Sequence, residues 1–69
     1  MESLADALPA EQARVRKLIT LYRDPALNGA GELSARMMEM SLQAADKAAA
    51  SGDVVGMIQA YEDLKGYSE

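Results

Sequence analysis

The sequence predicts an all-α fold, a three-helix bundle that forms a single domain over residues 1–69. The amino acids that dominate it are Ala, Leu, Met, Glu, Gln, Lys and Arg, which are the strongest helix formers. No stretch alternates apolar and polar residues with the β-branched enrichment of a strand. Two segments rich in turn-forming residues, 24–31 and 51–53, divide the chain into three pieces with helical periodicity.

The first helix is expected to begin near Pro9, because proline suits the first position of a helix. It should end at Arg23 or Asp24, because a proline follows and disfavours helix in the residue before it. Residues 3–8 have the spacing of a capping box and could form a short helical turn of their own. Apolar residues recur at helical spacing along the main helix: Val15, Leu18, Ile19 and Tyr22.

The middle helix is expected from about Glu32 to Ala50, and it is apolar on two faces. One stripe consists of Leu33, Met37, Met40, Ala44 and Ala48. The other consists of Met38, Leu42, Ala45 and Ala49. At about 100° per residue the two stripes cover roughly 200° of the helix surface, well beyond the stripe of an ordinary surface helix. We therefore expect more than one neighbour to cover this helix, with the first stripe in the intramolecular core and the second against another chain.

The third helix is expected to follow a tight connection. Gly52 suits the left-handed position that ends the middle helix, and Asp53 suits the N-cap of the next one. The helix should run to about Lys65, with Gly66 ending it. Gly56 either permits a close helix crossing or is simply exposed, and exposure is favoured. The apolar face of this helix comprises Val54, Met57, Ile58, Tyr61 and Leu64. Such a short connection makes an antiparallel hairpin, onto which the first helix can fold back.

Residues 44–64 combine small residues, then Gly-Asp, then an amphipathic helix with Tyr and Leu near its end. The residues that carry the pattern are Gly52, Asp53, Ala60, Tyr61 and Leu64. The pattern resembles a tetratricopeptide-type helix pair, although the Trp and second Gly of that family are missing and the chain has no second copy of the repeat. The resemblance implies protein binding. The chain also has the general look of small acidic helical proteins from phage and prophage genomes, which implies a factor that acts on another protein.

Cysteine and histidine are both absent from the 69 residues. Disulfide bonds and thiolate metal sites are therefore excluded. Histidine is also the commonest general base, and the serines have at best a lysine to activate them as nucleophiles. No glycine loop has the residues that cradle a phosphate group. We therefore expect a protein that is not an enzyme and has no catalytic residue, metal site or cofactor.

The net charge of −4 resides in the C-terminal half of the chain. Residues 37–69 hold six acidic and two basic groups, whereas residues 1–36 hold five of each. An acidic protein is repelled by phosphate backbones, so direct nucleic-acid binding is disfavoured. No apolar run approaches the ~20 residues of a membrane span, and the N-terminus does not resemble a secretory signal. We expect a cytoplasmic protein that does not bind membranes.

The function predicted from these features is a small protein–protein interaction module that uses its middle helix to form a homodimer, or else to bind another protein. The residues expected at the interface are Met38, Leu42, Ala45 and Ala49. The alternative is an acidic inhibitor or regulator of a nucleic-acid-acting protein, with an acidic face made of Glu39, Asp46, Glu62, Asp63 and Glu69. Arg16 and Arg23 share a face of the first helix and are candidates for contact with an anion or an acidic partner, although a solvated face is the simpler interpretation.

Overall fold

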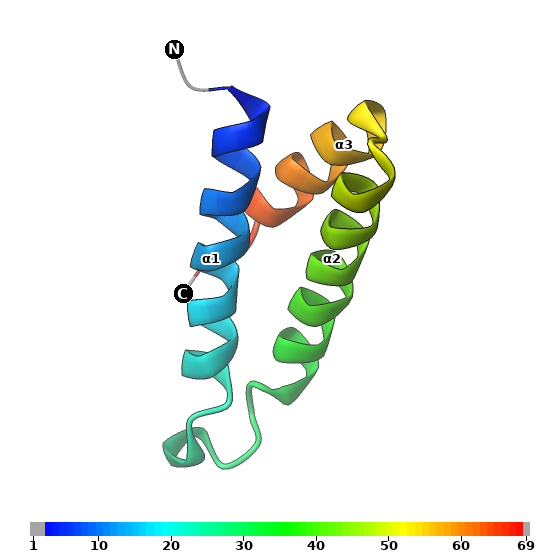
Figure 1. Cartoon of the computed structure of the whole chain (residues 1–69). Coiled ribbons are helices and arrows are strands. Elements are labelled where there is room, and N and C mark those ends of the chain that lie inside the picture. The colour runs from blue at the N-terminus through cyan, green and yellow to red at the C-terminus, as the bar shows by residue number, and fades with distance from the viewer. Residues whose placement is uncertain (1–2, 69) are drawn as a thin grey trace.

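The computed structural model describes residues 3–68, which form three α-helices and one short 3-10 turn. Their bounds are Leu4–Tyr22 for α1, Pro25–Leu27 for the 3-10 turn η1, Glu32–Ser51 for α2 and Val54–Lys65 for α3. The helices α1 and α2 run antiparallel beside each other, and α3 crosses behind them (Figure 1). Each helix packs on the other two. The prediction of an all-α three-helix bundle is confirmed.

The core lies where the three helices meet. Its buried apolar side chains include Leu8, Val15, Leu18, Met38, Leu42, Ala45, Ala60 and Leu64. The one buried polar side chain among the described residues, Gln12, donates from Nε2 to Asp46 Oδ1 at 2.8 Å. Because the buried amide has a partner on α2, burying it does not leave an unsatisfied donor.

The helix α1 begins earlier than the sequence predicts. It starts at Leu4, with Ser3 as the N-cap, so that Pro9 lies inside the helix rather than at its first position. Proline lacks an N–H group, and the carbonyl of Ala5 therefore loses its helical partner. Ala5 is exposed, so water can satisfy that carbonyl, whereas Leu8 is fully buried in the core. Burial of the first turns therefore outweighs the local cost of the proline.

The hairpin of α2 and α3 forms as the sequence predicts. Gly52 is left-handed, with a φ of 68°, and the Asp53 side chain accepts a hydrogen bond from the Gly56 backbone N–H at 3.0 Å. The expectation that Gly56 is simply exposed is wrong. A Cβ atom at this position would lie 3.2 Å from the Cβ of Ala48 and within 2.5 Å of the Asp53 carboxylate. The small residue therefore allows α3 to start close to the end of α2.

The connection between α1 and α2 turns tightly. Asp24 accepts a hydrogen bond from the Ala26 backbone N–H at 2.8 Å and so caps the 3-10 turn η1. Asn28 follows in the left-handed conformation. Gly31 then packs against the backbone of Tyr22 at the end of α1 and serves as the N-cap of α2. The loop thus brings the start of α2 into direct contact with the end of α1.

Candidate functional site

The structure reverses the predicted roles of the two apolar stripes of α2. Met38, Leu42 and Ala45 are 1 %, 7 % and 0 % exposed, so the prediction that they form an interface with another chain is wrong. Ala49, the last member of that stripe, is exposed near the end of the helix. Most of the stripe assigned to the core faces outward instead. Both stripes are apolar, so periodicity revealed two faces without showing which one α1 and α3 would cover.

Polar contacts between α1 and α2 accompany this orientation of α2. Glu39 and Asp46 lie on the side of α2 that faces α1. Glu39 accepts from Arg23, and Asp46 accepts from Gln12 and lies 3.5 Å from Arg16. With these carboxylates turned toward α1, the helical period places Met38 and its stripe in the core. The opposite stripe is then left at the surface.

We call Leu33, Met37, Met40 and Ala44 the outer stripe of α2. Leu33, Met37 and Met40 are 72 %, 51 % and 69 % exposed, and Ala44 is exposed as well. At 1.5 Å per residue the outer stripe is about 16 Å long. Ala48, which the sequence placed in the same set, is buried where α3 starts. A continuous apolar face of this kind marks an interaction site more often than scattered apolar residues do.

The two edges of the outer stripe differ. Arg36 and Lys47 are exposed and lie within roughly 80° of its centre on one side. Ser34 and Ser41 lie on the other side, where the Ser41 hydroxyl is 2.9 Å from the hydroxyl of Tyr67. One edge is therefore basic, and the other borders the segment that follows α3.

A second apolar surface lies on the first turns of α3. We call Val54, Val55 and Ile58 the α3 patch; they are 60 %, 65 % and 49 % exposed. Val54 and Ile58 belong to the apolar face predicted for the third helix, but the bundle leaves both of them exposed. The buried residues of α3 are Ala60 and Leu64, with Met57 and Tyr61 packed partly against the core.

The segment after α3 is fixed by contacts that the sequence did not reveal. The guanidinium of Arg14 donates from Nη2 to the carbonyl of Leu64 at 2.8 Å and from Nη1 to the carbonyl of Tyr67 at 2.9 Å. A cation near the last carbonyls of a helix is favourable, because the helix dipole is negative there. The carboxylate of Glu11 accepts a hydrogen bond from Nε of the same guanidinium at 2.6 Å. Bonds from a side chain to distant backbone carbonyls follow no sequence spacing, so no pattern could have indicated them.

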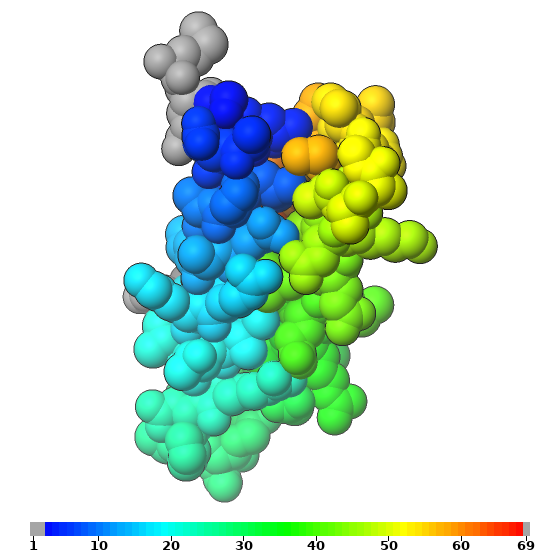
Figure 2. Space-filling view, viewed as in Figure 1, coloured from blue at the N-terminus to red at the C-terminus, as the bar shows by residue number. Residues whose placement is uncertain are grey.

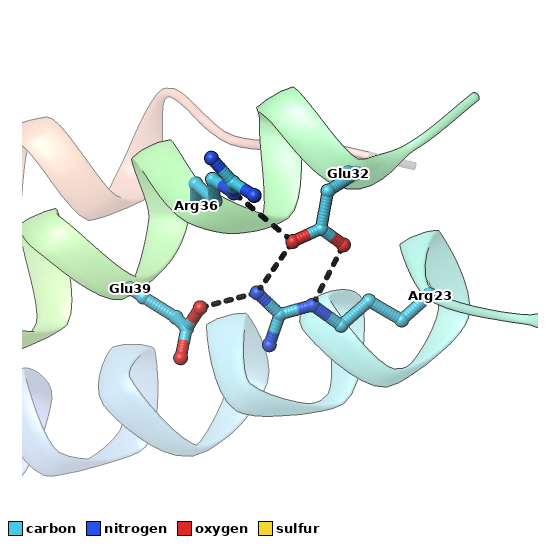
Figure 3. A network of polar contacts seen from close by, with 4 residues as sticks. All are labelled: Arg23, Glu32, Arg36 and Glu39. Carbon is cyan, nitrogen blue, oxygen red and sulfur yellow. Dashed lines mark hydrogen bonds and ion pairs between the residues drawn. The ribbon is translucent and has the colours of Figure 1, made fainter. Parts of the chain in front are cut away.

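Arg23 joins the two helices near the loop. Its guanidinium donates to both carboxylate oxygens of Glu32, at 3.2 Å each, and also to Glu39 (Figure 3). Arg36 donates to the same Glu32 carboxylate at 3.2 Å. The hydrogen bonds to Glu39 and Glu32 raise the pKa of Arg23. Arg16 approaches Asp46 on the same side of α1. Both arginines thus have partners within the chain, and the contact with an external anion stays a prediction.

The same network makes part of the stability depend on pH. Hydrogen bonds from Arg23, and then from Arg36, lower the pKa of Glu32 from its ordinary value of 4.5. A lowered folded-state pKa stabilises the fold above the ordinary pKa, and this stabilisation is lost as the pH falls through the folded-state value. We expect urea unfolding to show a stability difference between the wild type and Glu32→Gln near pH 6 that shrinks near pH 3. The effect should be small, because the groups are exposed. A difference independent of pH would contradict the pairing.

The described residues contain no enclosed site for a small ligand. Among residues 3–68 there is no pocket and no group of three or more His, Cys, Asp or Glu side chains that could hold a metal ion. On the face shown in Figure 2, the surfaces of α1, from blue to cyan, and α2, in green, meet along their length. No helix in this part of the chain is long and apolar enough to cross a membrane.

No known protein family matches this chain, and no curated protein or solved structure matches it either. The chain's own surfaces are therefore what indicate its function. Of these, the outer stripe of α2 has the largest exposed apolar side chains on a single helix face.

Proposed function

We propose that this chain is a small cytoplasmic protein–protein interaction module that self-associates through the outer stripe of α2. The observation that carries the proposal is the exposure of Leu33, Met37 and Met40 on one face of a helix whose opposite face fills the core. Removing apolar surface from water contributes about 25 cal/mol per Å², so covering this face is favourable. A second chain can provide the cover that α1 and α3 do not.

Size and composition support self-association. A single core in a chain of 69 residues supplies only about 3–5 kcal/mol of net stability, and small domains commonly gain more from disulfides, metals or oligomerisation. The absence of cysteine removes disulfides as a source of that stability. Methionine side chains are flexible and adapt to the shape of a partner, which suits Met37 and Met40 to an interface.

Light scattering over a range of concentrations tests the proposal. We expect the mass of the wild type to rise above that of one chain, and Met40→Glu to remain monomeric because association would move the new carboxylate out of water. Met40 is 69 % exposed, so the variant should keep its helix content by circular dichroism. Ala13→Glu is a matched control, since Ala13 is exposed on α1, away from the outer stripe. A wild type that is monomeric throughout, or a Met40→Glu variant that associates normally, would refute the proposal.

The alternative proposal, an acidic regulator of a nucleic-acid-acting protein, has less support. Glu39 and Asp46 face α1 and are paired with its arginines, so they do not contribute to a free acidic face. Glu62 and Asp63 are exposed on α3, and neither has an ion pair with another described residue. Glu69, the last member of the predicted acidic face, lies outside the described residues. This alternative therefore depends mainly on two adjacent carboxylates.

A further inference from the structure

We infer that the outer stripe of one copy binds the α3 patch of a second copy. The inference rests on the proposed function and names the surface that the outer stripe meets. Three features support it: both surfaces are apolar and uncovered, the charged groups nearest to them are opposite in sign, and antiparallel pairing of two outer stripes brings like charges together.

The outer stripe and the α3 patch are the two apolar helix faces that the bundle leaves uncovered within residues 3–68. They lie on different helices, and each faces away from the core that α2 and α3 share. Neither surface covers the other within one chain, since the large apolar side chains of both are about half exposed or more. A contact between copies would bury both surfaces together.

The charged groups beside the two surfaces are complementary. Exposed Arg36 and Lys47 follow one edge of the outer stripe. The α3 patch has exposed Asp53 at its N-terminal end and exposed Glu62 one turn beyond Ile58 on the same face. The one basic residue of α3, Lys65, lies about two turns beyond Ile58 on the same face, and its ammonium lies over the ring of Tyr61, 5.1 Å from the centroid. Opposite charges at the rim of an apolar contact favour the correct partner and set its orientation.

Antiparallel pairing between two outer stripes is less favourable. In an antiparallel pair related by a twofold axis, equivalent edges of the two helices lie on the same side. Lys47 and Arg36, which donates to Glu32 of its own chain, would then line one side of the contact in both copies. Docking the α3 patch on the outer stripe instead places carboxylates near that basic edge. In such a pair, the outer stripe of one copy contacts the α3 patch of the other. The pair therefore keeps one outer stripe and one α3 patch that contact nothing.

Two charge variants that each block one surface test the inference. Met40→Glu blocks the outer stripe and leaves the α3 patch intact, whereas Ile58→Glu blocks the α3 patch and leaves the outer stripe intact. We expect each variant alone to associate at least roughly thirtyfold more weakly than the wild type, because moving the new carboxylate out of water opposes the contact. An equimolar mixture should give a species with the mass of two chains, since one intact surface of each kind is then present.

The controls separate this inference from the proposed function. Val55→Glu, at another exposed position of the α3 patch, should associate as weakly as Ile58→Glu does. Ala13→Glu should associate as the wild type does. Circular dichroism checks that each variant is folded. If Met40→Glu is monomeric while folded Ile58→Glu and Val55→Glu associate normally, the inference is overturned and the proposed function stands. A monomeric wild type, or normal association of all the variants, overturns both. Monomeric single variants whose mixture does not associate also overturn the inference.

Discussion

Replacing Met38 with alanine is expected to destabilise the domain by about 2–5 kcal/mol, the usual cost of removing a large buried side chain. Met38 is 1 % exposed and lies in the core that the three helices share. The loss is comparable with the entire stability expected for so small a core, so the variant should be largely unfolded at room temperature. Met40→Ala makes the same chemical change two residues along, at a side chain that is 69 % exposed, and should cost less than about 0.5 kcal/mol.

Urea unfolding followed by circular dichroism measures both variants. The comparison should be made at high dilution, where loss of association does not add to the effect of Met40→Ala. For Met38→Ala alone, we expect less helix than in the wild type before urea is added, and an unfolding midpoint at a lower urea concentration. If Met40→Ala were the more damaging substitution, the outer stripe would belong to the core and the orientation of α2 described above would be wrong.

This pair of methionines also shows what could be predicted from the sequence. Periodicity revealed that α2 has two apolar faces, because spacing along a helix fixes which residues share a face. It could not choose between Met38 and Met40 as the core residue, because the two stripes have similar composition. The choice depends on how α2 packs against α1 and α3, and this packing exists only in the folded chain.

Local signals were reliable where one residue determines the backbone. Gly52 and Asp53 correctly marked the turn into α3, because a left-handed glycine and a capping carboxylate act within a few residues. Pro9 was misleading, since its preference for a first helical position was outweighed by the burial of Leu8 in the first turns of α1. The contacts of Arg14 with the end of α3 join residues 50 and 53 positions apart, beyond the reach of any local pattern.

Replacing Gly31 with alanine is expected to cost about 1–3 kcal/mol, through overpacking at the junction of α1 and α2. A Cβ atom at Gly31 would lie 2.1 Å from the carbonyl oxygen of Tyr22 and 2.8 Å from its carbonyl carbon. Both atoms belong to the backbone, so a side-chain rotation cannot relieve the clash and the chain must move. Such a shift would also separate Glu32, the next residue, from Arg23, which it pairs with across the same junction.

Gly29→Ala distinguishes this steric effect from backbone strain. Gly29 has a φ of 84°, but a Cβ atom there would meet nothing within 4 Å, so its replacement should cost only the ~1 kcal/mol of a left-handed alanine. Urea unfolding of both variants should therefore show the larger loss at Gly31, where φ is negative and the space is filled. Equal losses, or a smaller one at Gly31, would contradict the close approach to Tyr22. Because this junction fixes where α2 starts, and Leu33 of the outer stripe lies two residues further on, Gly31→Ala should also weaken self-association in whatever fraction of the protein remains folded.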